Sequence, residues 1–358
     1  MRLKSYLFLF CLILLCIFIP YSALASLRVT FFDTVQGAAL LQADGQTILI
    51  DSGMEEDSKK LLSSLNDFDI PKIDLMAATF IQGESTSGIS EVLKKYGFGT
   101  LWLPGLTAGE ESVDLVSGAK AITPEPGTQM DIGKAKVSAA RLSGYGTVAY
   151  LVLRVEYDGK SFLFMPGADA LGEAALVENG TDLHADVISM GGDKVPSQSI
   201  LDQVSPLWVV AGGELQPGAL TGAQDSDIYV LDPTKDGTVT FTLDGKALAA
   251  EYEASGITIQ SSVNVRKDAT TKAGKALTLS KGSVVSILGT AAGDEGIWYH
   301  IEADGKVGYV RGDLIQEISK DEAEKLLAEA TPKPRRSNNG SNSGSSGEDV
   351  PEEEVSCH

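Results

Sequence analysis

Ile48-Leu49-Ile50-Asp51-Ser52-Gly53 is the stretch that decides the fold of the larger part of this chain. Its aliphatic run predicts a buried strand, and the Asp-Ser-Gly that follows ends the strand in a turn. An earlier run, Leu27-Arg28-Val29-Thr30-Phe31-Phe32-Asp33, is rich in β-branched and aromatic residues and predicts a second strand. An Asp44-Gly45 turn lies between the two runs, which is typical of neighbouring strands in a sheet.

Helical and strand-like stretches alternate after this opening. Leu61, Leu62 and Leu65 recur at helical spacing, and the segment from Ile73 to Thr79 returns to a strand. A later block repeats the order, with strands expected at 161–165, 185–190, 207–211, 228–231 and 238–243 and a helix expected at 171–177. The alternation predicts a layered α/β domain over residues 27–252.

The first 25 residues have the composition of a secretion signal. Arg2 and Lys4 precede an apolar run, and Ala23-Leu24-Ala25 supplies the small residues of a cleavage site. The apolar run is shorter than the roughly 20 residues that cross a bilayer, which argues against an uncleaved anchor. We therefore expect an exported protein with no stable membrane span after cleavage at residue 25. Only Cys357 would then remain of the three cysteines, so no intramolecular disulfide could form.

The chain is strongly acidic, with a formal net charge of −20 from 49 acidic and 29 basic residues. An acidic surface repels phosphate backbones and teichoic-type polyanions unless a local basic patch exists. The only cluster of Lys and Arg evident along the sequence is Lys333, Arg335 and Arg336. It lies in the tail, 331–358, whose Pro, Ser, Gly and Glu content predicts disorder. We therefore expect no nucleic-acid partner.

The opening runs together resemble the start of the metallo-β-lactamase superfamily. Gln36-Gly37, Ile73-Asp74-Leu75 and Asp236-Gly237-Thr238 continue the likeness over about 225 residues, and it is closest to the domain of ComEC-type competence DNA-uptake channels. The resemblance implies a four-layer αββα sandwich, in which active members hold zinc with histidines and a carboxylate. It also implies that Asp51 satisfies backbone groups near the site instead of binding metal.

The zinc ligands of that family are missing from this sequence. The loop that carries most of them reads Thr79-Phe80-Ile81-Gln82-Gly83-Glu84-Ser85 here, and two of the later ligand steps read Gly167-Ala168 and Gly191-Gly192-Asp193. The final histidine, expected after Trp208-Val209-Val210, is absent from residues 212–222. The vestigial metal-site positions are thus Phe80, Gln82, Glu84, Ser85, Ala168, Gly192 and Asp193. Loss of every histidine removes the nitrogen donors of the site, so we expect no zinc, no other cofactor and no catalytic residue.

One alternative is an oxygen-only cation site. Gln82, Glu84, Asp193 and Asp169, which is displaced by one position, carry oxygen donors that suit calcium or magnesium. Such a site would make the protein a hydrolase or nuclease-like enzyme. A serine hydrolase is disfavoured, because no serine has a histidine at a motif spacing.

Helical periodicity disappears between residues 256 and 318, and short β runs with Gly-containing turns predict a small all-β barrel. Val263-Asn264-Val265-Arg266, Trp298-Tyr299-His300-Ile301 and Gly308-Tyr309-Val310 resemble a bacterial SH3-type domain. The resemblance implies binding of cell-wall peptide or glycan, with Trp298, Tyr299 and Tyr309 as candidate contacts. Trp298 and Tyr309 are equally compatible with a packing role. A helical spacer is expected at 319–330.

The sequence as a whole favours an exported, non-catalytic binding protein. Its larger domain would be a pseudoenzyme, and its SH3-type module would hold it at or near the cell envelope. The expected location is therefore extracellular or associated with the cell envelope. The expected partner is peptidoglycan or another wall component.

Overall fold

The computed structural model describes residues 27–34, 37–53, 57–81, 85–104, 121–142, 150–165, 170–178, 182–191, 196–213, 228–245 and 247–330. The expected signal at 1–25 and the expected tail at 331–358 lie outside these ranges. Among the described residues, no helix combines the length and the apolar character needed to span a bilayer.

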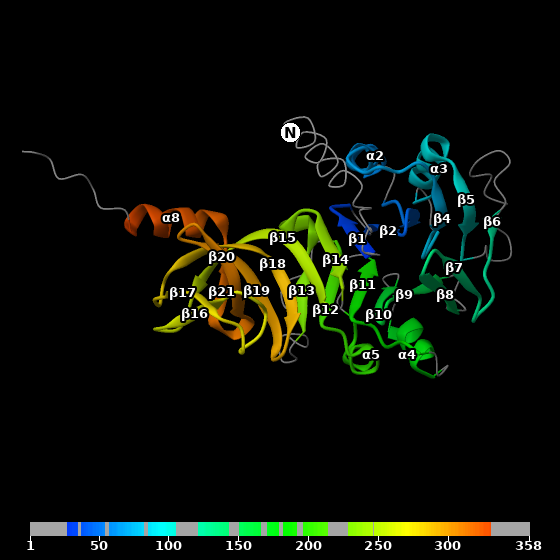
Figure 1. Cartoon of the computed structure of the whole chain (residues 1–358). Helices are drawn as coiled ribbons and strands as arrows, with labels where there is room; N and C mark the ends of the chain where they lie inside the picture. The colour runs from blue at the N-terminus through cyan, green and yellow to red at the C-terminus, as the bar shows by residue number, and fades with distance from the viewer. Residues whose placement is uncertain are drawn as a thin grey trace, which may run out of the picture.

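Two large sheets make up most of the molecule, and their order is shown in Figure 1. The fourteen-stranded sheet, called sheet one, contains β1 (Leu27–Phe32), β2 (Ala38–Ala43), β3 (Gln46–Ile50), β4 (Ile73–Ala77), β5 (Phe98–Trp102), β6 (Ala121–Ile122), β14 (Val239–Asp244), β15 (Ala247–Thr258), β16 (Val263–Arg266), β17 (Lys275–Leu279), β18 (Val284–Gly293), β19 (Gly296–Ala303), β20 (Lys306–Arg311) and β21 (Ile315–Ile318). The seven-stranded sheet, called sheet two, contains β7 (Gln129–Ile132), β8 (Ala135–Leu142), β9 (Tyr150–Tyr157), β10 (Lys160–Met165), β11 (Val187–Gly191), β12 (Trp208–Gly212) and β13 (Tyr229–Leu231).

The helices are short and lie between strands or at the end of the described chain. They are α2 (Ser58–Leu65), α3 (Ser85–Tyr96), α4 (Ala170–Glu178), α5 (Gln198–Val204), α7 (Pro233–Asp236) and α8 (Lys320–Ala330), with a 3₁₀ turn, η2 (Gly312–Leu314). The protein is thus a mixed α/β structure with large sheets, as the alternating pattern predicts.

The inner faces of the two sheets pack against each other through an aromatic core. Phe31 stacks on Phe164 with 5.9 Å between ring centroids, and Trp208 meets the edge of Phe241 at 5.4 Å. All four side chains are at most 3% exposed. Because inward-facing residues recur at every second position of a strand, β1 and β14 both supply this core from alternating apolar residues.

The helices cover the outer faces of the sheets. A second core joins α2 and α3 to sheet one, and it includes Leu61, Val92 and Met76. A third core joins α4 and α5 to sheet two, and it includes Leu176 and Leu201. Apolar residues of α2 and α3 recur on one face of each helix, which is why these segments form helices that pack on a sheet.

One strand, β15, belongs to both parts of the molecule. Its first half pairs with β14, where Thr240 lies opposite Glu251, and its second half pairs with β21, where Ser255 lies opposite Ile318. Strand β18 pairs with both halves of β15, with a register shift between Glu251 and Ala254. The strand therefore crosses the boundary expected between residues 252 and 256, and the small barrel continues sheet one (Figure 1).

Side chains reinforce this junction between the barrel and the larger domain. Trp208 Nε1 donates a hydrogen bond of 3.1 Å to Thr290 Oγ1, and both residues are almost completely buried. Nearby, the hydroxyls of Tyr229 and Tyr252 lie 2.6 Å apart and both donate to the carboxylate of Glu317. The Trp208–Thr290 bond favours one relative placement of the two parts, because breaking it would leave a buried group unpaired.

Replacing Thr290 with valine should lower the free energy of unfolding by about 1–3 kcal/mol, because the buried Trp208 Nε1 loses its acceptor. The measurement is urea unfolding within a double-mutant cycle that includes Trp208→Phe. In the Trp208→Phe background, Thr290→Val should cost much less, since no donor is left unpaired. Equal costs in both backgrounds would contradict a role for this hydrogen bond.

Candidate functional site

The carboxyl ends of the parallel strands of both sheets meet at one edge of the larger domain. Strands β3, β4 and β5 run parallel in sheet one, and β10, β11 and β12 run parallel in sheet two. The two edges are in contact between Gly37, at the end of the β1–β2 connection, and Gly212, the last residue of β12. A Cβ added to Gly37 would lie 3.4 Å from the Cα of Gly212. In α/β sheets, ligands bind at the carboxyl ends of the strands, so this edge is the first candidate site.

Asp51 lies at this edge, directly after β3, and its side chain is fixed by hydrogen bonds. Its carboxylate accepts hydrogen bonds from the Thr79 amide at 2.7 Å and the Thr79 hydroxyl at 2.8 Å. Its backbone is in the left-handed region, with φ of 57°. Burial raises the pKa of Asp51 to about 7, although the two bonds from Thr79 oppose the rise. The expected role of Asp51 in satisfying backbone groups is therefore confirmed.

Two buried hydroxyls beside Asp51 have no hydrogen-bond partner among the residues that the structure describes. They are Thr34 Oγ1 and Ser52 Oγ, and both residues are 2% exposed. A Cβ on Gly88, in the first turn of α3, would lie 2.8 Å from Ser52 Oγ, so a larger residue there would require the Ser52 side chain to move. Buried polar groups without a partner are uncommon in folded proteins. Sequence reasoning missed both hydroxyls, because Ser and Thr after a strand are typical of ordinary turns.

The vestigial metal positions are only partly described. Phe80 is half-buried and forms an isolated antiparallel bridge with Tyr150, which joins the end of β4 to the start of β9. Ser85 is the first residue of α3. The other vestigial positions lie outside the described residues: Gln82, Glu84, Ala168, Gly192 and Asp193. The possible oxygen donor Asp169 also lies outside them.

The described residues of the edge do not fit zinc. Phe80 carries no donor atom, and both carboxylate oxygens of Asp51 are already engaged by Thr79. Within the ranges that the structure describes, no group of three or more His, Cys, Asp or Glu residues could hold a metal ion. His184 lies elsewhere, with its Nδ1 3.1 Å from the carbonyl oxygen of Val204.

The barrel places its three aromatic candidates very differently. Trp298 is 2% exposed and Tyr299 is 7% exposed, and Tyr299 packs against Tyr229 at the junction with 5.7 Å between ring centroids. Their burial speaks against both as ligand contacts, because their ring faces are occupied by the protein itself. Tyr309 is half-buried and stacks on His300 with 4.7 Å between centroids, next to Arg266 in the strand register. Tyr309 thus stays a candidate contact.

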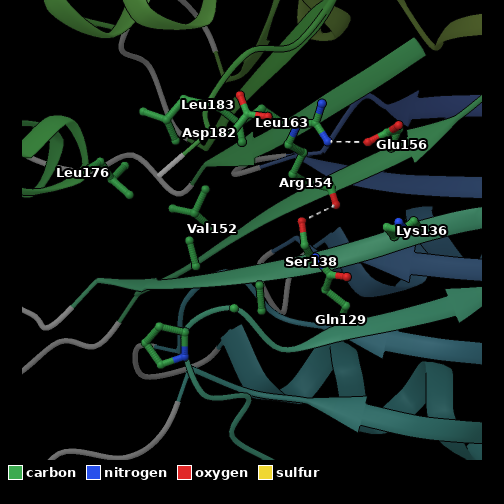
Figure 2. A pocket seen from close by; sticks show the side chains of 14 residues that line it. Gln129, Lys136, Ser138, Val152, Arg154, Glu156, Leu163, Leu176, Asp182 and Leu183 are labelled. Atoms are coloured by element: carbon green, nitrogen blue, oxygen red, sulfur yellow. Dashed lines mark hydrogen bonds and ion pairs between the residues drawn. The ribbon is translucent and has the colours of Figure 1, made fainter. Parts of the chain in front are cut away.

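A groove of about 790 Å³ lies on the outer face of sheet two, where β7, β8 and β9 extend beyond α4. Figure 2 shows Leu176 and Leu183 facing Val152 across it, with Arg154 paired to Glu156 at 2.8 Å. Lys136 and Asp182 add one charge of each sign. Because the charges balance and Arg154 is already paired, the groove favours no particular ligand charge.

A second cleft, of about 850 Å³, lies at the junction between the barrel and the larger domain. Its charged lining residues are Lys235, Asp236, Glu253, Glu302, Glu317 and Lys320. Burial, with the charge of Glu317, raises the pKa of Asp236 to about 6, whereas the backbone bond from Asp232 opposes the rise. The carboxylate of Glu317 is occupied by the tyrosine hydroxyls, so this cleft is part of the junction.

Comparison with known proteins agrees with the barrel. Residues 261–316 match the family described as bacterial SH3 domain, which confirms the expected SH3-type module. No curated protein matches the chain in sequence.

Among solved structures, the chain is structurally similar to proteins of the metallo-β-lactamase fold. One is the metallo-β-lactamase fold protein YhfI from Bacillus subtilis, at 13% identity and a TM-score of 0.41, over 58% of this chain and 96% of that one. Another is a Cronobacter sakazakii metallo-β-lactamase with a HARLDQ motif, at 15% identity and a TM-score of 0.36, over 46% and 74%. A CmlA β-hydroxylase variant is similar at 12% identity and a TM-score of 0.45, over 61% and 54%.

Proposed function

We propose that this chain is an exported, non-catalytic binding protein that attaches to the cell envelope through its SH3 domain. The observation that carries the proposal is the match of residues 261–316 to the bacterial SH3 domain, with Tyr309 half-buried on β20 and stacked on His300. Aromatic faces flanked by polar groups bind flexible peptide and glycan chains well. Peptidoglycan, or another wall polymer, is the partner that we propose.

The larger domain is, in this proposal, a pseudoenzyme with a four-layer αββα architecture related to the ComEC-type domain. Support comes from Phe80, which offers no ligand atom at a histidine position, and from Asp51, whose carboxylate is committed to Thr79. The domain would serve as the rigid body that the barrel carries to the envelope.

The envelope proposal is tested by sedimentation of the full-length protein with purified peptidoglycan sacculi. Tyr309→Ala should weaken binding roughly tenfold, because an aromatic contact at the centre of a site carries much of the affinity. Ile122→Ala, which truncates a side chain 41% exposed on β6, is the matched control and should bind like the parent. Recovery of the parent protein entirely in the supernatant would refute the envelope role.

The pseudoenzyme part has a separate test. Metal analysis of protein purified without chelator should find no stoichiometric metal, and millimolar calcium or magnesium should leave the melting temperature unchanged. A stoichiometric metal that is lost on Glu84→Ala would establish the enzyme alternative instead.

A further inference from the structure

The hairpin formed by β16 and β17 is basic in an otherwise acidic protein. Residues 263–282, here called the basic hairpin, contain five basic residues and a single acidic one, Asp268. The basic residues are Arg266, Lys267, Lys272, Lys275 and Lys281. The whole chain carries a net charge of −20, so this segment has the opposite sign to the chain as a whole. The prediction that the only Lys and Arg cluster lies at 333–336 is therefore wrong.

The lysine charges of the basic hairpin are free to meet a partner. Lys267, Lys272, Lys275 and Lys281 are all exposed, and within the described part of the chain none of them takes part in an ion pair. By contrast, Arg311 of the same barrel is bound to Glu295 and Asp313. Within the described residues, the barrel thus pairs Arg311 with acidic residues and leaves these four lysines open to solvent.

The tip of the hairpin is held in place rather than left loose. Asp294, in the turn between β18 and β19, accepts hydrogen bonds from Thr270 Oγ1 at 2.7 Å and from the amide and hydroxyl of Thr271 at 3.2 and 3.0 Å. Arg266 Nη1 donates to the carbonyl oxygen of Ala273 at 2.8 Å. Because these bonds order the backbone between Lys267 and Lys275, a partner would lose little by binding to it.

The hairpin and strands β4 to β6 of sheet one lie at opposite ends of the molecule. Figure 1 shows β16 and β17 at the end of the molecule farthest from β4, β5 and β6. Charges more than about 8 Å apart are largely screened at physiological salt, so a bound polymer would meet the local lysines and not the total charge of the chain. Tyr309 adjoins Arg266 in the strand register, which joins the basic hairpin to the proposed contact surface.

Edge protection does not account for this arrangement. Strand β17 is the outermost strand of sheet one, and lysine on an edge strand prevents pairing with other sheets. Only Lys275 lies on β17, whereas Lys267, Lys272 and Lys281 lie in the flanking turns. Three of the four lysines therefore lie outside the edge strand, so protection of that strand does not explain them.

We propose that the basic hairpin binds an anionic envelope polymer with closely spaced phosphate groups. This inference rests on the proposed function and narrows its ligand class from wall polymers in general to polyanionic ones. Lysine acts as a point charge toward phosphate, so the contact would read charge spacing along the polymer and not a particular sugar or base.

The test measures binding of the full-length protein to long-chain inorganic polyphosphate over a series of salt concentrations. The variant reverses Lys267, Lys272 and Lys275 to glutamate, and the control reverses Lys59, Lys94 and Lys134, which are exposed lysines of the larger domain. Both variants have the same net charge. The hairpin variant should bind roughly tenfold or more weakly, and its slope of log affinity against log salt should fall by about 2. The control should bind like the parent.

Each other outcome has a definite meaning. Equal weakening in both variants would show that total charge, and not the basic hairpin, controls binding and would overturn the inference. Tighter binding to double-stranded DNA or to phosphatidylglycerol vesicles than to polyphosphate would overturn it in favour of a nucleic acid or a membrane. Binding to sacculi without binding to polyphosphate would refute the anionic class alone, whereas loss of both would refute the proposed function as well.

Discussion

Replacing Gly289 with alanine should destabilise the protein by more than about 4 kcal/mol, a large part of the 5–15 kcal/mol that holds a typical domain folded. Gly289 lies on β18 opposite Glu251 of β15, at the register shift of the junction. A Cβ there would lie 2.0 Å from the carbonyl oxygen of Ala250. The backbone φ is 147°, a value that residues with a side chain rarely adopt. Since that oxygen belongs to a paired strand, it cannot move without opening β15 and β18.

The measurement is equilibrium urea unfolding, with Gly305→Ala as the matched control. Gly305 also has a positive φ, of 68°, but a Cβ there would meet nothing within 4 Å. The control should therefore cost only about 1–2 kcal/mol, the strain of a left-handed residue. If Gly289→Ala proves as mild as Gly305→Ala, then β15 and β18 do not form the tight pair that joins the barrel to the larger domain.

Replacing Asp51 with asparagine should stabilise the protein at pH 8 and leave it unchanged at pH 3. The pKa of Asp51 rises from 3.8 to about 7 on folding, so the folded state holds its proton more tightly than the unfolded chain does. Below pH 3.8 both states are protonated and the residue has no effect. As pH rises from 3.8 to 7, the unfolded state loses its proton first, and stability falls by up to about 4 kcal/mol.

Asparagine resembles the protonated carboxyl in shape but does not ionise, so the variant does not lose this stability as the pH rises. Its oxygen can accept from the Thr79 amide, its amide can donate to the Thr79 hydroxyl, and asparagine tolerates a φ of 57°. The measurement is the difference in unfolding free energy between variant and parent from pH 3 to pH 8. Asp236, whose pKa also rises, contributes equally to both proteins and cancels.

Asp51→Ala is the contrasting variant. It leaves the Thr79 amide without an acceptor and should lower stability by about 1–3 kcal/mol at pH 3, where the parent carboxyl is neutral and still bonded. A flat difference between Asp51→Asn and the parent across the pH range would show that the carboxyl of Asp51 titrates normally in the folded protein.

The sequence predicts individual strands well wherever a short apolar run ends in a turn. The strand expected at 161–165 is β10 at Lys160–Met165, and the helix expected at 171–177 is α4 at Ala170–Glu178. These elements are local, so periodicity within one window is sufficient to find them. The SH3 domain follows from several such runs in a characteristic order.

Features that depend on distant partners escape this kind of reasoning. Nothing near residues 247–258 signals one strand that pairs with β14 at one end and β21 at the other, because the partners lie elsewhere in the chain. Burial of Tyr299 depends on Tyr229, seventy positions earlier, and so could not be read from the barrel alone. The lysines of the basic hairpin are spread along residues 267–281, so no short stretch of the sequence stands out as a basic cluster.

The strand shared by the two domains determines how the molecule would respond to a pull. A partner that holds the barrel and drags on it loads β15 along its own axis, where its hydrogen bonds to β14 and β18 act in shear and must fail together. A jointed pair of domains would instead extend at its linker under a small force. A strand shared in this way would therefore transmit tension from the barrel to the larger domain without stretching between them.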